Sequence, residues 1–398
     1  MFGYALKNNR EAEMPYFYWL SLTLDIGIRR YMKMQSLFAS PKELYEAGPL
    51  KWEKSGAFSE KMISKLAKLK KETNPVEEYA KMLEGGTRML VFEDDDFPGR
   101  LKTIPSAPVF LFARGKLPRE NTPVVSVIGA RECSLYGERV AARLGEMLAR
   151  FNISLASGMA RGIDSISQRA CAEAGGYSLA VLGGGPDICY PEEAYDLYLR
   201  LEKEGGIISE YPPGTEPKPA FFACRNRIIS GISDAVCVVE ARDKSGTMIT
   251  VDAALEQGRE VFAVPGKITD LTSRGCNELI KQGAGSITNI EEFLEELREN
   301  FFLRSVGKTG AGTDDDSFGQ NPEGKIDEEW LEILEKTGDD SFTVGELAAK
   351  LNSPVAHVMT VCLKMSATGL MSNMGAGRFS ATKEGVNIRF RKKTLKGE

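Results

Sequence analysis

The sequence predicts an α/β protein whose largest part is a doubly wound parallel β-sheet. Short β-branched runs alternate with helical stretches between residues 123 and 300, with a repeat of about 25 to 30 residues. These runs are apolar along nearly their whole length, which is typical of strands buried on both faces. The stretches between them are long enough to cross over a sheet and connect parallel strands.

Seven strands are expected in this part of the chain. They lie near residues 124–128, 153–155, 178–182, 206–209, 235–239, 261–264 and 286–288. The stretch after the first strand places Val140, Leu144, Met147 and Leu148 at helical spacing, so it predicts a helix that packs against the sheet.

With 398 residues, the chain is long enough for two or three domains. From about residue 15 to 74 apolar residues recur at helical spacing, which predicts a small helical domain over residues 1–85. Its stretch 59–71 places several lysines on one amphipathic helix, which favours an ordinary solvated face over a phosphate contact. The sheet domain is expected to span residues 86–302.

The last part of the chain predicts a linker and a further small domain. Residues 303–325 are rich in Gly, Asp and Ser, which favours a flexible linker. Helices are expected at residues 326–337, 344–351 and 354–368, followed by a glycine-tipped hairpin at 370–381. This order predicts a winged-helix domain with a basic tail over residues 326–398.

Composition limits the kinds of site that the chain can hold. The formal net charge is -5, so a nucleic-acid site has to be a local cationic patch. The seven cysteines are never spaced as C-x-x-C and His357 is the single histidine, so no metal site and no catalytic histidine are expected. Free thiols, no apolar run long enough for a membrane span and no signal peptide favour a cytoplasmic protein.

Glycine-rich turns and cations follow the expected strands. Ligands bind beyond the carboxyl ends of parallel strands, where glycines bring backbone N–H groups close and arginines add charge, so these turns suit phosphate. The cations that can converge on one rim are Arg131, Arg161, Arg225, Arg227 and Lys244. The alternative is that the arginines form structural ion pairs with Asp164, Glu210 and Glu240.

The sequence favours one class of phosphate-containing ligand over the others. A dinucleotide fingerprint needs G-x-G-x-x-G after the first strand, whereas this chain has Gly129-Ala-Arg131 there, so a dehydrogenase is disfavoured. Phe221, Phe222 and Tyr136 lie near the cations in the sequence. Cations with aromatic rings favour a polynucleotide whose bases stack, although a core role is the alternative for each phenylalanine.

The order of motifs resembles the DNA processing protein A (DprA/Smf) family. The matching motifs are collinear over the whole central domain: Val127-Ile-Gly-Ala-Arg131, Ser157-Gly-Met-Ala-Arg-Gly-Ile-Asp164, Val181-Leu-Gly-Gly-Gly185, Tyr190-Pro191, Ser209-Glu210, Pro212-Pro-Gly214, Arg225-Asn-Arg-Ile-Ile229, Val239-Glu-Ala241, Lys244-Ser-Gly246 and Val261-Phe-Ala-Val-Pro-Gly266. The flanks are similar to the family's SAM-like or HhH-like amino-terminal domain and to its optional winged helix.

This resemblance implies a Rossmann-like core that binds single-stranded DNA without sequence preference, forms a homodimer and loads the RecA recombinase in natural transformation or recombination. We expect no cofactor, no catalytic residue and no membrane contact. The binding residues that it implies are Gly129, Arg131, Ser157, Gly158, Met159, Arg225, Asn226, Arg227, Lys244, Ser245 and Gly246, to which the strand-end pattern adds Arg161.

Four positions depart from the family pattern, namely Ala130, Gln168, Ala194 and Ala223, where Ser, His, Asn and Pro are usual. These departures spare the cations, so they are expected to change affinity rather than to abolish binding. In the predicted winged helix, the third helix offers only His357 and Lys364 as cations, which favours a protein contact over duplex DNA binding.

An enzyme of related fold is the competing hypothesis. Nucleotide phosphoribohydrolases of the cytokinin-activating type carry a Pro-Gly-Gly-x-Gly-Thr-x-x-Glu loop, whereas this chain has Ser245-Gly-Thr247 and places Thr250 at the position of the catalytic Glu. Threonine cannot act as a carboxylate base. Glu240 or Glu210 can in principle replace it, so the enzyme remains the alternative.

Overall fold

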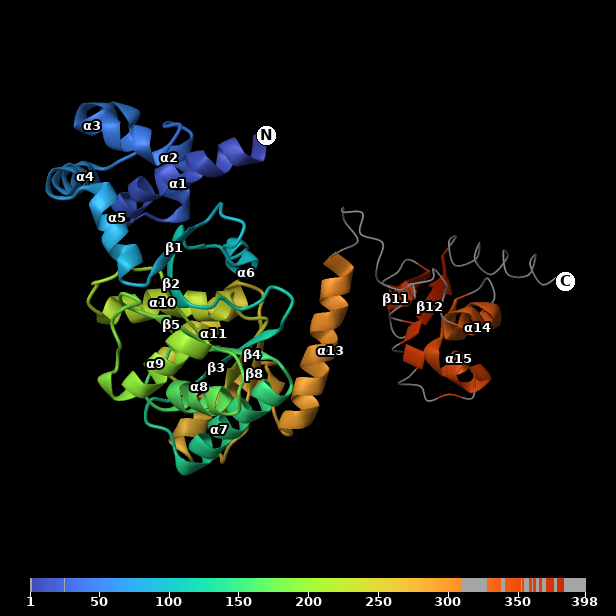
Figure 1. Ribbon diagram of the computed structural model, residues 1–398. Coiled ribbons are helices and arrows are strands. Elements are labelled where there is room, and N and C mark those ends of the chain that lie inside the picture. The colour runs from blue at the N-terminus through green and yellow to red at the C-terminus, as the bar shows by residue number, and fades with distance from the viewer. Residues whose placement is uncertain are drawn as a thin grey trace. The chain divides into compact units, whose positions relative to one another are not determined.

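The computed structural model describes residues 2–24, 26–308, 328–337, 341–351, 353, 358–359, 361–362, 365–366, 370–375 and 378–382. The chain divides into two compact units, residues 1–295 and residues 296–398 (Figure 1). No helix within the described ranges is long and apolar enough to cross a membrane.

A nine-stranded sheet forms the centre of the first unit, in the order β1-β2-β6-β5-β4-β3-β7-β8-β9. Its strands are β1 (Arg88–Val91), β2 (Phe110–Gly115), β3 (Val124–Ile128), β4 (Ser154–Ser157), β5 (Ser178–Leu182), β6 (Gly206–Ser209), β7 (Ala235–Val238), β8 (Glu260–Ala263) and β9 (Gly285–Ser286). Strands β3 to β9 pair in parallel. The predicted α/β class is therefore confirmed, and the seven expected strands appear within two residues of their expected bounds.

Strands β1 and β2 form an antiparallel edge that the sequence analysis did not predict. Along β2, Phe110 and Phe112 pack among the amino-terminal helices, while Leu111 and Ala113 pack in the core of the sheet. A strand buried on both faces shows no alternation of apolar and polar residues, which is why this run does not stand out as a half-buried strand.

Five helices precede the sheet: α1 (Phe2–Ser21), α2 (Ile28–Gln35), α3 (Pro41–Ser55), α4 (Glu60–Glu72) and α5 (Pro75–Glu84). Two of these helices have a serine N-cap. The Ser40 side chain accepts a hydrogen bond from a backbone N–H of α3, and the Ser59 side chain accepts one from a backbone N–H of α4. Trp19 and Trp52 are fully buried between these helices. In Figure 1 the five helices gather beside β1, and their apolar cluster includes side chains of β1 and β2.

Helices cover both faces of the sheet. One face carries α7 (Leu135–Arg150), α8 (Ile163–Glu173) and α9 (Tyr195–Glu204), and the other carries α6 (Gly99–Lys102), α10 (Pro219–Gly231), α11 (Gly246–Glu256) and α12 (Arg274–Lys281). The predicted stripe of α7 is buried at Leu144, Met147 and Leu148 and half-buried at Val140. Two 3₁₀ turns, Glu192–Ala194 and Leu271–Ser273, complete the connections.

The described part of the second unit contains α14 (Glu328–Thr337), α15 (Val344–Leu351) and a three-stranded antiparallel sheet of β10 (Phe342–Thr343), β11 (Met371–Gly375) and β12 (Arg378–Ala381). Helix α13 (Ile290–Lys308) continues through the first six residues of the predicted linker. The rest of that linker, the basic tail and most of the predicted third helix, with His357 and Lys364, lie outside the described residues. The winged helix therefore stays a prediction.

Candidate functional site

A cavity of about 620 Å³ opens where the order of the parallel strands reverses. Strand β3 lies between β4 and β7, and the chain runs outward through β4, β5 and β6 before returning to β7. Such a switch point separates the loops that follow two neighbouring strands and leaves room for a ligand. This switch-point cavity is lined by the residues after β3 and β7, by α10 and by the first turn of α11.

A buried arginine and a buried aspartate lie at the floor of the cavity. Arg225, on α10, donates from Nη1 to the carbonyl oxygens of Gly158, at 2.8 Å, and of Val181. Asp164 accepts from the backbone N–H of Gly158 at 3.1 Å. Desolvation lowers the pKa of Arg225 to about 10, an effect that Asp164 opposes and the nearby charge of Arg131 reinforces. Desolvation raises the pKa of Asp164, and Arg225 opposes that shift.

Buried hydrogen bonds fix the loop that follows β4. Met159 has a φ of 53° and donates its backbone N–H to Oε1 of Gln168 at 2.9 Å. The fully buried Gln168 also donates to the carbonyl oxygen of Leu179 at 3.0 Å, and Ser157 donates its hydroxyl to Val127 at 2.6 Å. Ser157, Gly158 and Met159 are all buried, so these three predicted binding residues support the cavity rather than line it.

An exposed cation and two stacked rings form one side of the cavity. The rings of Tyr190 and Phe222 stack with centroids 5.3 Å apart, and Tyr190 is 50% exposed. The guanidinium of Arg131 lies over the Phe222 ring at 5.8 Å from its centroid. Arg242, also exposed, lines the cavity as well. Tyr190 and Arg242 are not among the binding residues predicted from the sequence, although both lie within or directly after the quoted motifs.

The amino end of α11 faces the same cavity. Ser245 precedes this helix, and its buried hydroxyl has no hydrogen-bond partner among the described residues. The first turn contains no acidic residue, so the partial positive charge of the helix end is not neutralised there. Asn226 donates to the Gly246 carbonyl at 3.4 Å, and Thr247 donates to the Gly129 carbonyl at 3.2 Å. The resulting turn presents backbone N–H groups that suit an anion.

The five predicted cations do not share one environment. Arg131 and Arg225 line the cavity. Arg227 donates to both carboxylate oxygens of Glu210 at 2.6 Å, and Arg161 pairs with Glu193. Lys244 is exposed directly before Ser245, outside the lining. Gly129, Asn226, Ser245 and Gly246 complete the predicted residues that do line the cavity.

The two carboxylates that the enzyme hypothesis left open are both engaged in the fold. Glu240 is buried and accepts from the backbone N–H of Ser134 at 2.9 Å and from its hydroxyl at 2.6 Å. Glu210 is held by Arg227. Thr250 lies in the cavity wall. This arrangement favours binding of an anion with a stackable ring over base catalysis by either carboxylate.

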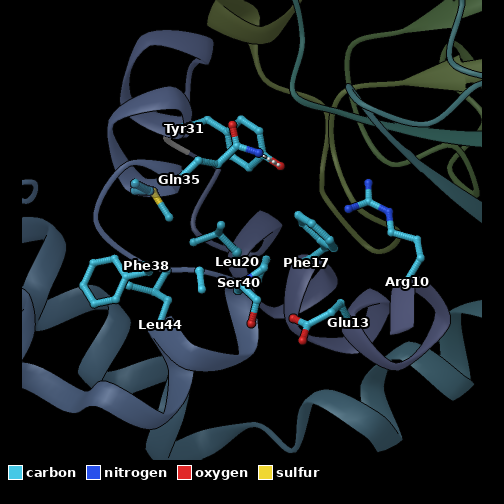
Figure 2. A pocket seen from close by; sticks show the side chains of 12 residues that line it. Arg10, Glu13, Phe17, Leu20, Tyr31, Gln35, Phe38, Ser40 and Leu44 are labelled. Atoms are coloured by element: carbon cyan, nitrogen blue, oxygen red, sulfur yellow. Dashed lines mark hydrogen bonds between the residues drawn. The ribbon is translucent and has the colours of Figure 1, made fainter. Parts of the chain in front are cut away.

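A second cavity, of about 240 Å³, lies among the amino-terminal helices (Figure 2). Its floor is apolar, and its polar rim is internally paired: Gln35 donates to the Tyr31 hydroxyl at 3.2 Å and to Glu93 at 2.6 Å. Arg10 pairs with Asp94 at 2.7 Å. The switch-point cavity, with its exposed cations and unpartnered hydroxyl, is therefore the better candidate.

Comparisons with known proteins agree with the motif order. Residues 88–298 match the model of the family described as DNA recombination-mediator protein A. Protein Smf of Escherichia coli is 36% identical over 297 residues, which cover 74% of this chain and 78% of that protein. DprA of Streptococcus pneumoniae is 39% identical over 204 residues, which cover 51% of this chain and 72% of that protein.

Solved structures give the same result. The X-ray structure of DprA from Streptococcus pneumoniae has a TM-score of 0.56 and 33% identity, and covers 62% of this chain and 86% of that one. The structure of DprA from Helicobacter pylori, reported for its single-stranded DNA binding mode, has a TM-score of 0.50 and 27% identity. It covers 54% of this chain and 96% of that one. The resemblance predicted from the motifs is confirmed, and the chain belongs to the DNA recombination-mediator protein A family.

Proposed function

We propose that this chain binds single-stranded DNA without sequence preference in the switch-point cavity and acts in DNA processing during recombination. The observation that carries the proposal is the position of Arg131 and the Tyr190–Phe222 ring pair in the cavity that also contains the amino end of α11. A cation and a helix amino end attract a phosphate, while a ring pair offers a flat surface to a base.

This combination favours an unpaired strand. Bases inside a duplex already stack on one another, so only a base from a single strand can lie against Tyr190. Stacking uses the face of a base, which all four bases have, and therefore gives little sequence preference. Family membership supports the same conclusion, since the Helicobacter pylori relative is reported to bind single-stranded DNA.

We assign different roles to the predicted binding residues. Arg131, Ser245 and Gly246 contact a phosphate directly, with Gly129 and Asn226 shaping the turns beside it. Arg225 adds positive charge from the buried floor, where Asp164 balances it. Ser157, Gly158 and Met159 support the floor of the cavity and so position these binding residues. Arg161, Arg227 and Lys244 lie outside the lining and have no direct contact in this proposal.

The partner proteins and the remaining domains belong to the same proposal. Family membership supports a homodimer that loads RecA in transformation or general recombination. The divisions 1–85, 86–302, 303–325 and 326–398 are proposed as the functional parts, with the last of them contacting protein. We propose no enzymatic activity, so release of ribose 5-phosphate from a nucleoside monophosphate would contradict this account.

Fluorescence anisotropy with labelled oligo-dT and its duplex, over a salt series, tests the proposal. The single strand should bind more tightly than the duplex. Arg131→Ala should reduce affinity about fivefold at 0.1 M salt and make the log-log salt slope shallower by about 0.7. Arg119→Ala, which removes an exposed arginine outside the cavity, is the matched control and should change neither value. Single-strand binding that is indifferent to Arg131 would reject the cavity as the binding site.

A further inference from the structure

Helix α4 carries a row of cations that its own sequence balances only in part. Lys61, Lys65, Lys68 and Lys71 follow one another at spacings of four, three and three residues, and no acidic residue lies between Glu60 and Glu72. Residues at these spacings share a helix face. Like charges on one helix face destabilise the helix, so this row lowers the stability of α4.

Several other helices of the first unit pair exposed cations with carboxylates. Examples are Arg143 with Glu146 and Glu291, Arg150 with Glu146, Arg169 with Asp196 and Arg200 with Glu204. On α4, Lys68 reaches only Glu72 at 4.0 Å, and its side chain is 72% exposed. Lys61 and Lys71 are exposed and form no ion pair with the described residues.

Two other lysines of α4 fix the helix in place. The Lys65 ammonium donates to the carbonyl oxygen of Thr23, and that of Lys70 donates to Tyr45. Met62 and Leu66 are buried in the cluster of the amino-terminal helices. These contacts hold the apolar side of α4 inward and leave Lys61, Lys68 and Lys71 in solvent. We call these three residues the lysine face; α4 lies at the edge of the helical group in Figure 1.

We propose that the lysine face is a second DNA contact, which binds phosphates of the strand outside the segment that occupies the switch-point cavity. This inference rests on the proposed function. Lys61 and Lys71 are ten residues apart, about 15 Å along a helix, which is enough for contacts with several phosphates of one strand. Release of counterions from a polyanion requires only such positive charges.

The composition of this face favours DNA over the two other classes of anionic partner. A helix that binds a lipid surface inserts exposed apolar residues, whereas none of the exposed large apolar side chains lies on α4. A protein partner requires an anchoring apolar or aromatic residue at the centre of its interface, and the lysine face has none. Three solvated ammonium groups with no apolar neighbour on the same face fit phosphates that are bound through charge alone.

The test compares strand lengths in the intact protein. A strand of about six nucleotides fills little more than one site, whereas a strand of about 40 nucleotides can reach both. The variant Lys61→Gln, Lys68→Gln, Lys71→Gln should lose at least tenfold in affinity for the long strand at low salt, with a salt slope shallower by about 2. Its affinity for the short strand should stay within about twofold of the unaltered protein.

A matched control removes the same charge elsewhere. Lys116→Gln, Arg119→Gln, Lys203→Gln also removes three exposed cations and should leave both strands unaffected. An unchanged slope for the long strand, an equal loss in the control, or unchanged DNA binding together with lysine-dependent binding to phosphatidylserine vesicles would each overturn the inference. If the proposed function itself is wrong, the short strand will not bind even to the unaltered protein. The two failures can therefore be distinguished.

Discussion

The guanidinium of Arg225 occupies the space that a side chain at Gly158 would require. A Cβ at position 158 would lie 2.6 Å from Cζ of Arg225, well inside van der Waals contact. The backbone N–H of the same glycine donates to Asp164, and its carbonyl oxygen accepts from Arg225. One residue without a side chain therefore contacts both of these buried charged residues.

Gly158→Ala should displace Arg225 from its carbonyl partners. We expect a loss of about 1–3 kcal/mol in the free energy of unfolding, because a buried charged group loses hydrogen bonds. Single-strand affinity should fall as well. Urea denaturation and anisotropy measure the two effects. Gly27→Ala, at a site where a Cβ meets no atom within 4 Å, should change stability by less than about 0.5 kcal/mol.

Removing one of these two buried, opposite charges should cost more stability than removing both. Arg225→Met leaves the buried Asp164 carboxylate without its cation, and we expect a loss of about 3–5 kcal/mol. The double variant Arg225→Met, Asp164→Leu should recover part of this stability. A double-mutant cycle by urea denaturation measures the coupling, and strictly additive losses would contradict the pairing.

The stacked rings allow a test with a neighbouring control. Phe222→Ala should weaken single-strand binding by about 1–3 kcal/mol, since it removes the ring that holds Tyr190 in place as a stacking surface for a base. Phe222→Trp should retain binding, and its fluorescence should be quenched by DNA.

The preceding residue on the same helix is the control for this stack. The ring of Phe221 stacks on Tyr211 at 4.1 Å, and Phe221 does not line the cavity. Phe221→Ala should therefore lower stability without changing the affinity per folded molecule. Equal losses of affinity in Phe221→Ala and Phe222→Ala would argue against stacking at Phe222.

A carboxylate at the start of α11 should move stability and binding in opposite directions. A Cβ at Gly246 meets no atom within 4 Å, so Gly246→Asp introduces no clash. An acidic residue near a helix amino end stabilises it by about 0.3–1 kcal/mol, but it would repel a bound phosphate. We expect single-strand affinity to fall at least tenfold while thermal stability holds or rises. Gly246→Asn, of similar size but neutral, should bind more tightly than Gly246→Asp.

Arg227 provides a contrast with Arg131. Because Arg227 is held by both oxygens of Glu210, Arg227→Met should mainly reduce stability and leave the salt slope of DNA binding unchanged. Arg131→Ala should make the salt slope shallower and leave stability nearly unchanged. A slope change of about 0.7 in Arg227→Met would show that this arginine contacts phosphate in the complex.

The sheet could be predicted from the sequence because buried parallel strands leave a local signal. The runs at 124–128 and 178–182 match β3 and β5 in full. The glycine turns after β3 and β4 were also visible, since each directly follows its strand. By contrast, Val109–Ala113 lies between two cores, and its uninterrupted apolar pattern resembles any buried segment.

Composition and spacing left structural ion pairs with Glu210 open as an alternative, but they could not predict which arginine pairs with which carboxylate. Arg161 meets Glu193 across 32 residues of chain, and Arg227 meets Glu210 across 17. The stacking of Tyr190 on Phe222 is likewise a contact between distant parts of the chain. Whether an arginine is free to bind a ligand or is neutralised by a carboxylate depends on these contacts, so the sequence identified the edge of the sheet but not the group of residues that lines it.

Strand β2 has a consequence for how the first unit unfolds. Its phenylalanines belong to the apolar cluster of the helices and its intervening residues belong to that of the sheet. Loss of the helices would expose Phe110 and Phe112 to water, and loss of the strand would remove one wall of the helical cluster. The helices and the sheet should therefore melt together in a single cooperative transition, and a chain beginning at residue 86 would be prone to aggregate through its uncovered apolar face.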